Sequence, residues 1–270
     1  MNGSNKIAVL IDGDNAESAL IEQILAEAGK NGRVTIKRIY ADWTENRMGK
    51  WKEQLNKHAI RPMQKFAYAY GKNSTDTALI IDAMDILHSE LVDGFCIVSS
   101  DSDYTGLAHR IREQGLFVMG IGKGHTPEAF VKSCESFTYT EILKPQENKE
   151  EKKASDETDK SEHIKVNAPK LPGIKVVGKI DLNLIGSLKK SGVKSINLND
   201  IDAAFNMVVD INTGLALLSR FSEALRRIDP TFDHRNFGCS SFRKFCESLA
   251  PNYITVLHDD NVTISLKRKE

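Results

Sequence analysis

The chain has 270 residues, of which 40% are hydrophobic and 27% charged, and its 37 lysines and arginines balance its 37 aspartates and glutamates. This composition is typical of a globular protein with one large or two smaller domains, and no uninterrupted apolar run reaches the ~18–20 residues of a membrane helix. Because the N-terminus lacks a secretory pattern and the four cysteines show no CxxC or zinc-ligand spacing, we expect a cytoplasmic protein without membrane association.

The first half of the chain alternates between short β-rich runs and segments of helix length. Strands are expected at 7–11, 34–41, 60–66, 95–98 and 116–121, and helices at 16–28, 48–58, 75–91, 104–114 and 127–133. This alternation predicts an α/β domain with a mostly parallel central sheet over residues 1–144. The runs 7–11 and 95–98 are continuously apolar, which is typical of central strands covered on both faces.

A charged segment over residues 145–172 separates this domain from a second one. Residues 146–162 contain one alanine and no larger apolar residue, so they cannot bury enough surface to offset their ordering entropy, and we predict a flexible linker. After it, helices are expected near 182–190, 198–205, 215–227 and 241–249, followed by a hairpin of strands 253–257 and 262–266. Short helices followed by a β-hairpin predict a small winged-helix-like domain over residues 173–270.

Acidic residues follow two of the expected central strands and begin one helix. Asp12 and Asp14 follow the first strand, Asp101 and Asp103 follow the fourth, and Asp76 opens the third helix. Ligands of open parallel sheets bind beyond the carboxyl ends of the strands, and right-handed crossovers place helix starts at the same edge. Gathered carboxylates repel one another unless a hard cation such as Mg²⁺ neutralises them. The pattern therefore predicts a metal site of the kind that activates water in phosphodiester cleavage.

Polar residues near these acids are candidates for supporting roles. Asn15 and Ser100 are expected to orient a water or a carboxylate, as is Ser99, and Lys72 is expected to offset phosphate charge. Asp82 is less clear, because it lies roughly 240° around a helix from Asp76 at ~100° per residue and so does not share its face. It either supports the site or is solvent-exposed.

Helix capping is the alternative explanation for several of these polar residues. Any one of them alone is explained by a side chain that caps free backbone amides, namely Asn15, Ser74, Ser102 or Asp103. Capping does not explain Asp12, which ends an apolar strand before a glycine, nor two acids after each of two strands. The set as a whole favours a metal site.

The first domain resembles the NYN family, a branch of the PIN-like metal-dependent ribonucleases. The resemblance rests on residues 11–15, 60–68, 71–76, 81–85, 98–104 and 122–130. It implies a PIN-like Rossmannoid fold and Mg²⁺- or Mn²⁺-dependent cleavage of RNA. By the same resemblance, the catalytic and metal-binding quartet comprises Asp12, Asp76, Asp101 and Asp103, with Asn15 beside it and Asp82 as a further support.

The C-terminal domain resembles the OST-HTH (LOTUS) domain, on the evidence of residues 217–221, 225–232, 235–238 and 240–245. This resemblance implies RNA binding or protein docking. The cationic candidates for RNA contact are Arg226, Arg227, Arg235, Arg243 and Lys244. Nearby Phe237 and Phe242 suit base stacking, although phenylalanines at this spacing also suit a core, and arginines commonly cover helix surfaces. RNA contact, protein docking and a purely structural role stay open.

The leading interpretation is a metal-dependent ribonuclease whose C-terminal domain aids RNA or partner binding. One alternative is a non-catalytic RNA-binding or regulatory adaptor with a nuclease-like pocket. Another is a haloacid-dehalogenase-type phosphatase with Asp12 as nucleophile, although Ala16 and Glu17 stand where that motif usually places a hydroxyl. RNA is the expected partner. A protein partner of the C-terminal domain and a homodimer are further possibilities.

Overall fold

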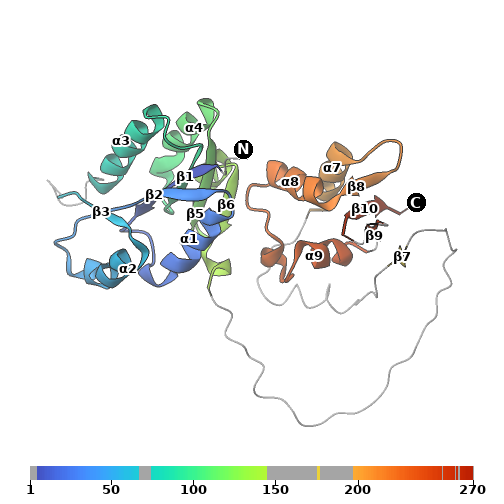
Figure 1. The fold of residues 1–270 in the computed structure, drawn as a ribbon, viewed down its shortest axis with the longest axis horizontal. Coiled ribbons are helices and arrows are strands. Elements are labelled where there is room, and N and C mark those ends of the chain that lie inside the picture. Colours follow the sequence, from blue (N-terminus) through green and yellow to red (C-terminus); the bar gives the residue numbers. More distant parts are fainter. Residues whose placement is uncertain are drawn as a thin grey trace, which may run out of the picture.

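The computed structural model describes residues 5–66, 74–144, 175–176, 197–250, 252–258, 260 and 262–269. They form an N-terminal α/β domain and a smaller C-terminal domain, which lie at opposite ends of Figure 1. The linker predicted at 145–172 and the helix predicted at 182–190 lie outside the described residues, and the domain boundaries stay predictions. Within the described part of the chain, no helix combines the length and the apolar composition needed to cross a bilayer.

A six-stranded parallel sheet organises the N-terminal domain, in the order β3-β2-β1-β4-β5-β6. The strands are β1 (Lys6–Asp12), β2 (Arg33–Ala41), β3 (Arg61–Gln64), β4 (Gly94–Val98), β5 (Phe117–Gly122) and β6 (Ser136–Tyr139). The five predicted strands are confirmed. The sixth, β6, is four residues long and carries polar residues, so only its pairing with β5 identifies it as a strand.

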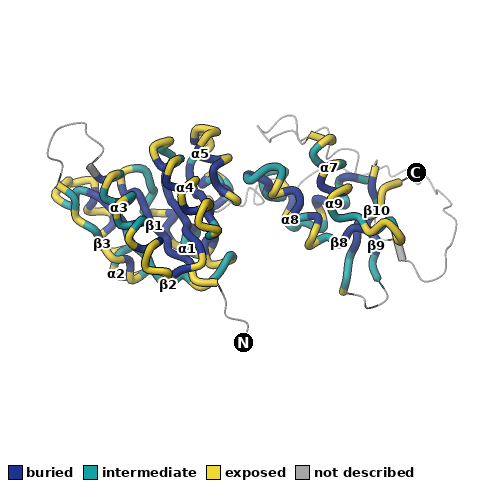
Figure 2. Tube along the Cα trace, turned by 90° about the horizontal axis from the view of Figure 1, so that it is seen from above, coloured by how far each residue is buried: buried dark blue, intermediate teal, exposed yellow. Residues whose placement is uncertain are grey.

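Helices cover both faces of this sheet (Figure 1). They are α1 (Ile21–Gly29) and α2 (Trp51–His58) on one face, and α3 (Ser74–His88), α4 (Thr105–Glu113) and α5 (Glu128–Ser133) on the other. Side chains of β1 alternate between the two cores, since Leu10 packs with α3 to α5 and Val9 packs with α1 and α2. Double coverage explains why β1 is continuously apolar, and Figure 2 shows it buried between the helix layers.

The C-terminal domain combines short helices with a four-stranded antiparallel sheet in the order β7-β9-β10-β8. Its helices are α7 (Leu198–Val208), α8 (Leu218–Ile228) and α9 (Phe242–Ser248), with a 3-10 turn η6 (His234–Phe237). Its strands are β7 (Lys175–Val176), β8 (Leu215–Leu217), β9 (Tyr253–Leu257) and β10 (Ile264–Arg268). Helices followed by this hairpin form the predicted winged-helix-like arrangement.

Two details of this domain differ from the sequence-based expectation. The helix expected at 215–227 begins only at Leu218, because residues 215–217 pair with β10 and this pairing overrides their helix propensity. The second hairpin strand begins at Ile264 rather than at 262. Oδ1 of Asp260 accepts the N–H groups of Val262 and Thr263, which places these two residues in the turn.

Candidate metal centre at the carboxyl ends of β1 and β4

The candidate site lies where the direction of strand connection reverses. From β1 the chain proceeds outward to β2 and β3, whereas β4, β5 and β6 follow on the other side of β1. Such a switch point opens a crevice beyond the carboxyl ends of the two central strands. Asp12 ends β1, and the segment from Ser99 to Asp103 directly follows β4. The topology thus brings together acids that are distant in the sequence.

Three carboxylates form a cluster at this point. Oxygens of Asp76, Asp101 and Asp103 all lie within 4.8 Å of one another. Asp76 comes from the first turn of α3, and the other two come from the turn after β4. Oδ1 of Asp101 also accepts the backbone N–H of Asp103 at 2.9 Å, so Asp101 caps the 3-10 turn that begins there. The side chain of Asp101 therefore caps a helical turn and belongs to the carboxylate cluster at the same time.

Asp12 is the buried member of the predicted quartet, with no exposed surface. Its Oδ2 accepts hydrogen bonds from the side chains of Asn15 (2.6 Å) and Ser99 (2.8 Å), and its Oδ1 accepts the N–H of Asp14 (3.0 Å). Burial raises the pKa of the Asp12 carboxyl group, and these hydrogen bonds oppose that shift because they stabilise the charged form. Oγ of Ser99 also accepts the N–H of Asp101 at 3.1 Å, which links Asp12 to the cluster.

The electrostatics of the cluster fit a divalent cation. Burial raises the pKa of Asp76, and the hydroxyl of Tyr104, which donates to Oδ1 of Asp76 at 2.7 Å, lowers it. The neighbouring carboxylates of Asp12, Asp101 and Asp103 raise the pKa of Asp76 further. Carboxylate oxygens are the donors that Mg²⁺ and Mn²⁺ prefer, and a cation would offset this repulsion. The donor set therefore suits such an ion.

We expect Asp76→Asn to raise the melting temperature of the metal-free protein at pH 7. A carboxyl group whose pKa is higher in the folded than in the unfolded chain binds more protons when folded, so its contribution to stability falls as pH rises above 3.8. The neutral amide removes this penalty and retains an oxygen for the Tyr104 hydroxyl. The difference should shrink towards pH 4. Asp85→Asn, at an exposed position of the same helix, should change nothing, and a lower melting temperature for Asp76→Asn would contradict the argument.

Comparison with known proteins identifies both parts of the chain. A family model of the NYN domain matches residues 6–143, about half of the chain. The chain belongs to the NYN domain family. An OST-HTH/LOTUS domain model matches residues 206–255, so both predicted resemblances are confirmed. NYN domains belong to the PIN-like nuclease superfamily, whose NYN members typically depend on divalent metals, and OST-HTH/LOTUS domains bind RNA.

Solved structures with similarity to this NYN protein include the two that follow, and no curated protein matches it. A protein of unknown function from Vibrio parahaemolyticus is 21% identical, with 51% of this chain and 93% of that chain covered and a TM-score of 0.43. MurG of Acinetobacter baumannii is 11% identical, with 50% of this chain and 40% of that chain covered and a TM-score of 0.35.

The other candidate residues of the NYN domain differ in which residues they contact. Asn15 contacts Asp12, as described, and Oγ of Ser100 accepts the N–H of Lys123 at 2.9 Å. Asp82 lies on α3 but bonds to Arg38 and to the hydroxyl of Tyr40, both on β2. The structure therefore does not bring Asp82 into the carboxylate cluster. Lys72 lies outside the described residues.

Two contacts at the site were not foreseen from the sequence. Tyr104 is fully buried, and its hydroxyl holds Asp76. Its position directly after Asp103 was the available signal, but a buried tyrosine is equally well explained by core packing. Asp14 forms an ion pair with Arg47 at 2.8 Å. Arg47 lies in the 3-10 turn Asn46–Lys50, whose approach to the end of β1 is decided by the packing of Met48 and Trp51 in the core.

Proposed function

We propose that the NYN domain is a divalent-metal-dependent ribonuclease that cleaves phosphodiester bonds in RNA, with Mg²⁺ or Mn²⁺ as its cofactor. The observation that carries this proposal is the cluster of Asp76, Asp101 and Asp103 at the switch point of a NYN-family sheet. These three side chains would hold the cation, and Asp12 would complete the quartet from the buried side. The bound cation would supply positive charge and activate water for attack on the phosphate.

Polar side chains around the acids would position the carboxylates for this reaction. The Tyr104 hydroxyl holds Asp76 in one orientation, and Ser99 joins the Asp12 carboxylate to the backbone of Asp101. Asn15 fixes the Asp12 carboxylate further, and Ser100 anchors the loop after β5. Because Asp12 is fully buried and both its oxygens accept hydrogen bonds, the geometry supports a positioning role rather than the nucleophile of a phosphatase.

The OST-HTH domain is proposed to aid RNA binding through exposed cations. Arg226 and Arg227 are exposed at the end of α8, and Lys244 is exposed on α9. Arg243 pairs with Glu247 at 2.9 Å, and Arg235 is held in ion pairs described below. Phe237 and Phe242 pack against the core of this domain, in ring contact with Phe245. These two rings are therefore not expected to stack on RNA bases.

The test uses the purified full chain and labelled single-stranded RNA. Cleavage is expected with Mg²⁺ or Mn²⁺, and not with EDTA or with an Asp101→Asn variant purified in parallel. Asp85→Asn, which removes an exposed carboxylate, should cleave like the wild type. Equal degradation by the wild type and Asp101→Asn would indicate a contaminating nuclease. Metal-independent RNA binding without any cleavage would favour the adaptor alternative. A cytoplasmic location, a protein partner and a homodimer stay predictions.

A further inference from the structure

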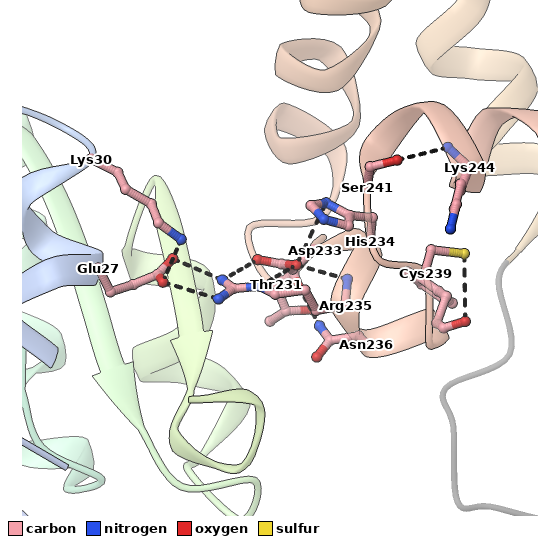
Figure 3. A network of polar contacts seen from close by, with 11 residues as sticks. Glu27, Lys30, Thr231, Asp233, His234, Arg235, Asn236, Cys239, Ser241 and Lys244 are labelled. Atoms are coloured by element: carbon pink, nitrogen blue, oxygen red, sulfur yellow. Dashed lines mark hydrogen bonds and ion pairs between the residues drawn. The ribbon is translucent and has the colours of Figure 1, made fainter. Parts of the chain in front are cut away.

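The two domains meet at the edge of the NYN sheet through directed polar contacts (Figure 3). The backbone N–H of Phe137 in the edge strand β6 donates to the carbonyl oxygen of Pro230 at 2.8 Å. The guanidinium of Arg235 donates to both carboxylate oxygens of Glu27, at 2.9 and 3.1 Å, and is held on its other side by Asp233 at 2.6 and 2.9 Å. We therefore assign Arg235 to domain docking rather than to RNA.

This docking contact favours one orientation of the two domains relative to each other. Glu27 is only 7% exposed, and its carboxylate also accepts from Lys30 at 2.7 Å. Bidentate arginine–carboxylate pairs are geometrically specific, and this pair is largely withdrawn from solvent, with side-chain exposures of 9% for Glu27 and 28% for Arg235. The contact at Glu27 therefore fixes how the OST-HTH domain faces the NYN domain.

A cleft of about 570 Å³ adjoins this contact and is lined by both domains. The NYN side contributes Arg112 from α4 and Lys132 from α5, and the OST-HTH side contributes Arg226 and Arg227 from α8. All four cations are exposed. The carboxylates among the lining residues are Glu135 and Glu223, so positive charge prevails.

The cations of the cleft are available to a ligand. Arg112 donates to the carbonyl oxygen of Ser133 at 3.2 Å through one of its nitrogens, and Lys132 pairs with the exposed Glu128 at 2.6 Å. An exposed ion pair such as Lys132–Glu128 is weak and rearranges readily. Among the described residues, Arg226 and Arg227 form no ion pair, and arginine is well suited to bind phosphate oxygens in a bidentate manner.

We propose that this interdomain cleft binds the phosphate backbone of RNA, so that the two domains together hold the strand that the carboxylate site cleaves. The inference rests on the proposed ribonuclease function for the substrate. The NYN domain needs such a surface because residues 1–144 carry 17 basic and 19 acidic side chains, a net charge of −2, and its catalytic edge is acidic. The cleft collects cations from both domains and thereby extends the basic surface beyond the OST-HTH domain.

The position of the cleft predicts how it contributes. Phe117 and Ser136 line it and begin β5 and β6, so it lies at the amino ends of the strands, opposite the carboxylate edge. The six-residue strand β5 spans roughly 20 Å, which is too far for a residue at its start to contact the reacting phosphate. The cleft should therefore affect RNA affinity and KM, and leave kcat unchanged.

The experiment compares RNA binding by two triple variants of the full chain in EDTA, where no cleavage occurs. Arg112→Ala/Arg226→Ala/Arg227→Ala removes cleft cations from both domains. The matched control is Arg110→Ala/Arg220→Ala/Lys267→Ala, which removes the same charge from exposed positions of α4, α8 and β10 outside the cleft lining. The cleft variant should lose about tenfold or more in affinity, with a salt slope shallower by about 2, because each lost phosphate contact changes the slope by roughly 0.7–0.9.

Cleavage with Mn²⁺ then separates the two proposals. A raised KM with unchanged kcat in the cleft variant supports the cleft. The cleft proposal is overturned if the cleft variant keeps the RNA affinity of the wild type, or if the control variant loses as much affinity as the cleft variant. An unchanged affinity of the cleft variant would leave an acidic protein as the ligand of these cations. If the wild type binds RNA through the cleft but cleaves nothing, the ribonuclease proposal fails while the cleft stands.

Discussion

Replacing Asp12 with alanine is expected to reduce RNA cleavage by at least about 100-fold and to lower the free energy of unfolding by about 3 kcal/mol. The alanine leaves three donors without their acceptor: the buried hydroxyl of Ser99, and the partly buried amide of Asn15 and backbone N–H of Asp14. Each unpaired buried polar group costs about 1–3 kcal/mol, and removal of a buried charge offsets part of the sum. Cleavage falls because Ser99 no longer joins Asp12 to Asp101.

Asp12→Asn separates the structural from the chemical part of this effect. The amide retains an oxygen that accepts from Ser99 and Asn15, so urea denaturation should show most of the stability restored. Cleavage should stay low, because the negative charge beside Asp76 is lost. An Asp12→Asn variant with wild-type cleavage, or an Asp12→Ala variant with wild-type stability, would refute the role assigned to this side chain.

Replacing Phe130 with alanine is expected to lower the free energy of unfolding of the NYN domain by about 4 kcal/mol. The ring is fully buried and packs edge-on against Phe137, with centroids 5.8 Å apart, and against Tyr104 at 6.3 Å. The cavity would adjoin the tyrosine that positions Asp76, so the affinity for Mn²⁺ should fall as well. Urea denaturation followed by tryptophan fluorescence measures the first effect, and Mn²⁺ titration measures the second.

Phe221→Ala supplies the matched control for this prediction. Phe221 is fully buried in the separate core of the OST-HTH domain. Both tryptophans of the chain, Trp43 and Trp51, lie in the NYN domain, so their fluorescence reports on that domain. The control should destabilise the OST-HTH domain in circular dichroism while the tryptophan transition and Mn²⁺ binding stay unchanged. Equal effects of both variants on Mn²⁺ binding would contradict the link from Phe130 through Tyr104 to Asp76.

The carboxylate cluster was predictable because its cause is topological. Asp101 and Asp103 follow the apolar strand β4 and Asp76 lies in the first turn of α3, and strand ends and helix starts meet at one edge of a parallel sheet. Helical periodicity also separated Asp82 from Asp76, and the structure pairs Asp82 with Arg38 on the neighbouring strand. These inferences required only strand order and the repeat of a helix.

Local sequence patterns did not predict the secondary structure of segments whose conformation is decided by a neighbouring strand. The strand β6 is short and partly polar, and it exists as a strand because β5 pairs with it. Residues 215–217 join a sheet because β10 lies beside them. Backbone hydrogen-bonding groups take the partners that the assembled fold offers, and a window of sequence contains no information about those partners.

The amino-acid sequence alone determined the α/β character of the first domain, the winged-helix-like character of the second and which acids were candidates for the carboxylate cluster, because hydrophobic periodicity and residue type are local properties. Only the tertiary structure decided that Tyr104 holds Asp76, that Ser99 joins Asp12 to Asp101 and that Arg235 docks onto Glu27. Hydrogen bonds and ion pairs act over a few ångströms, so their partners are set by how the elements pack together.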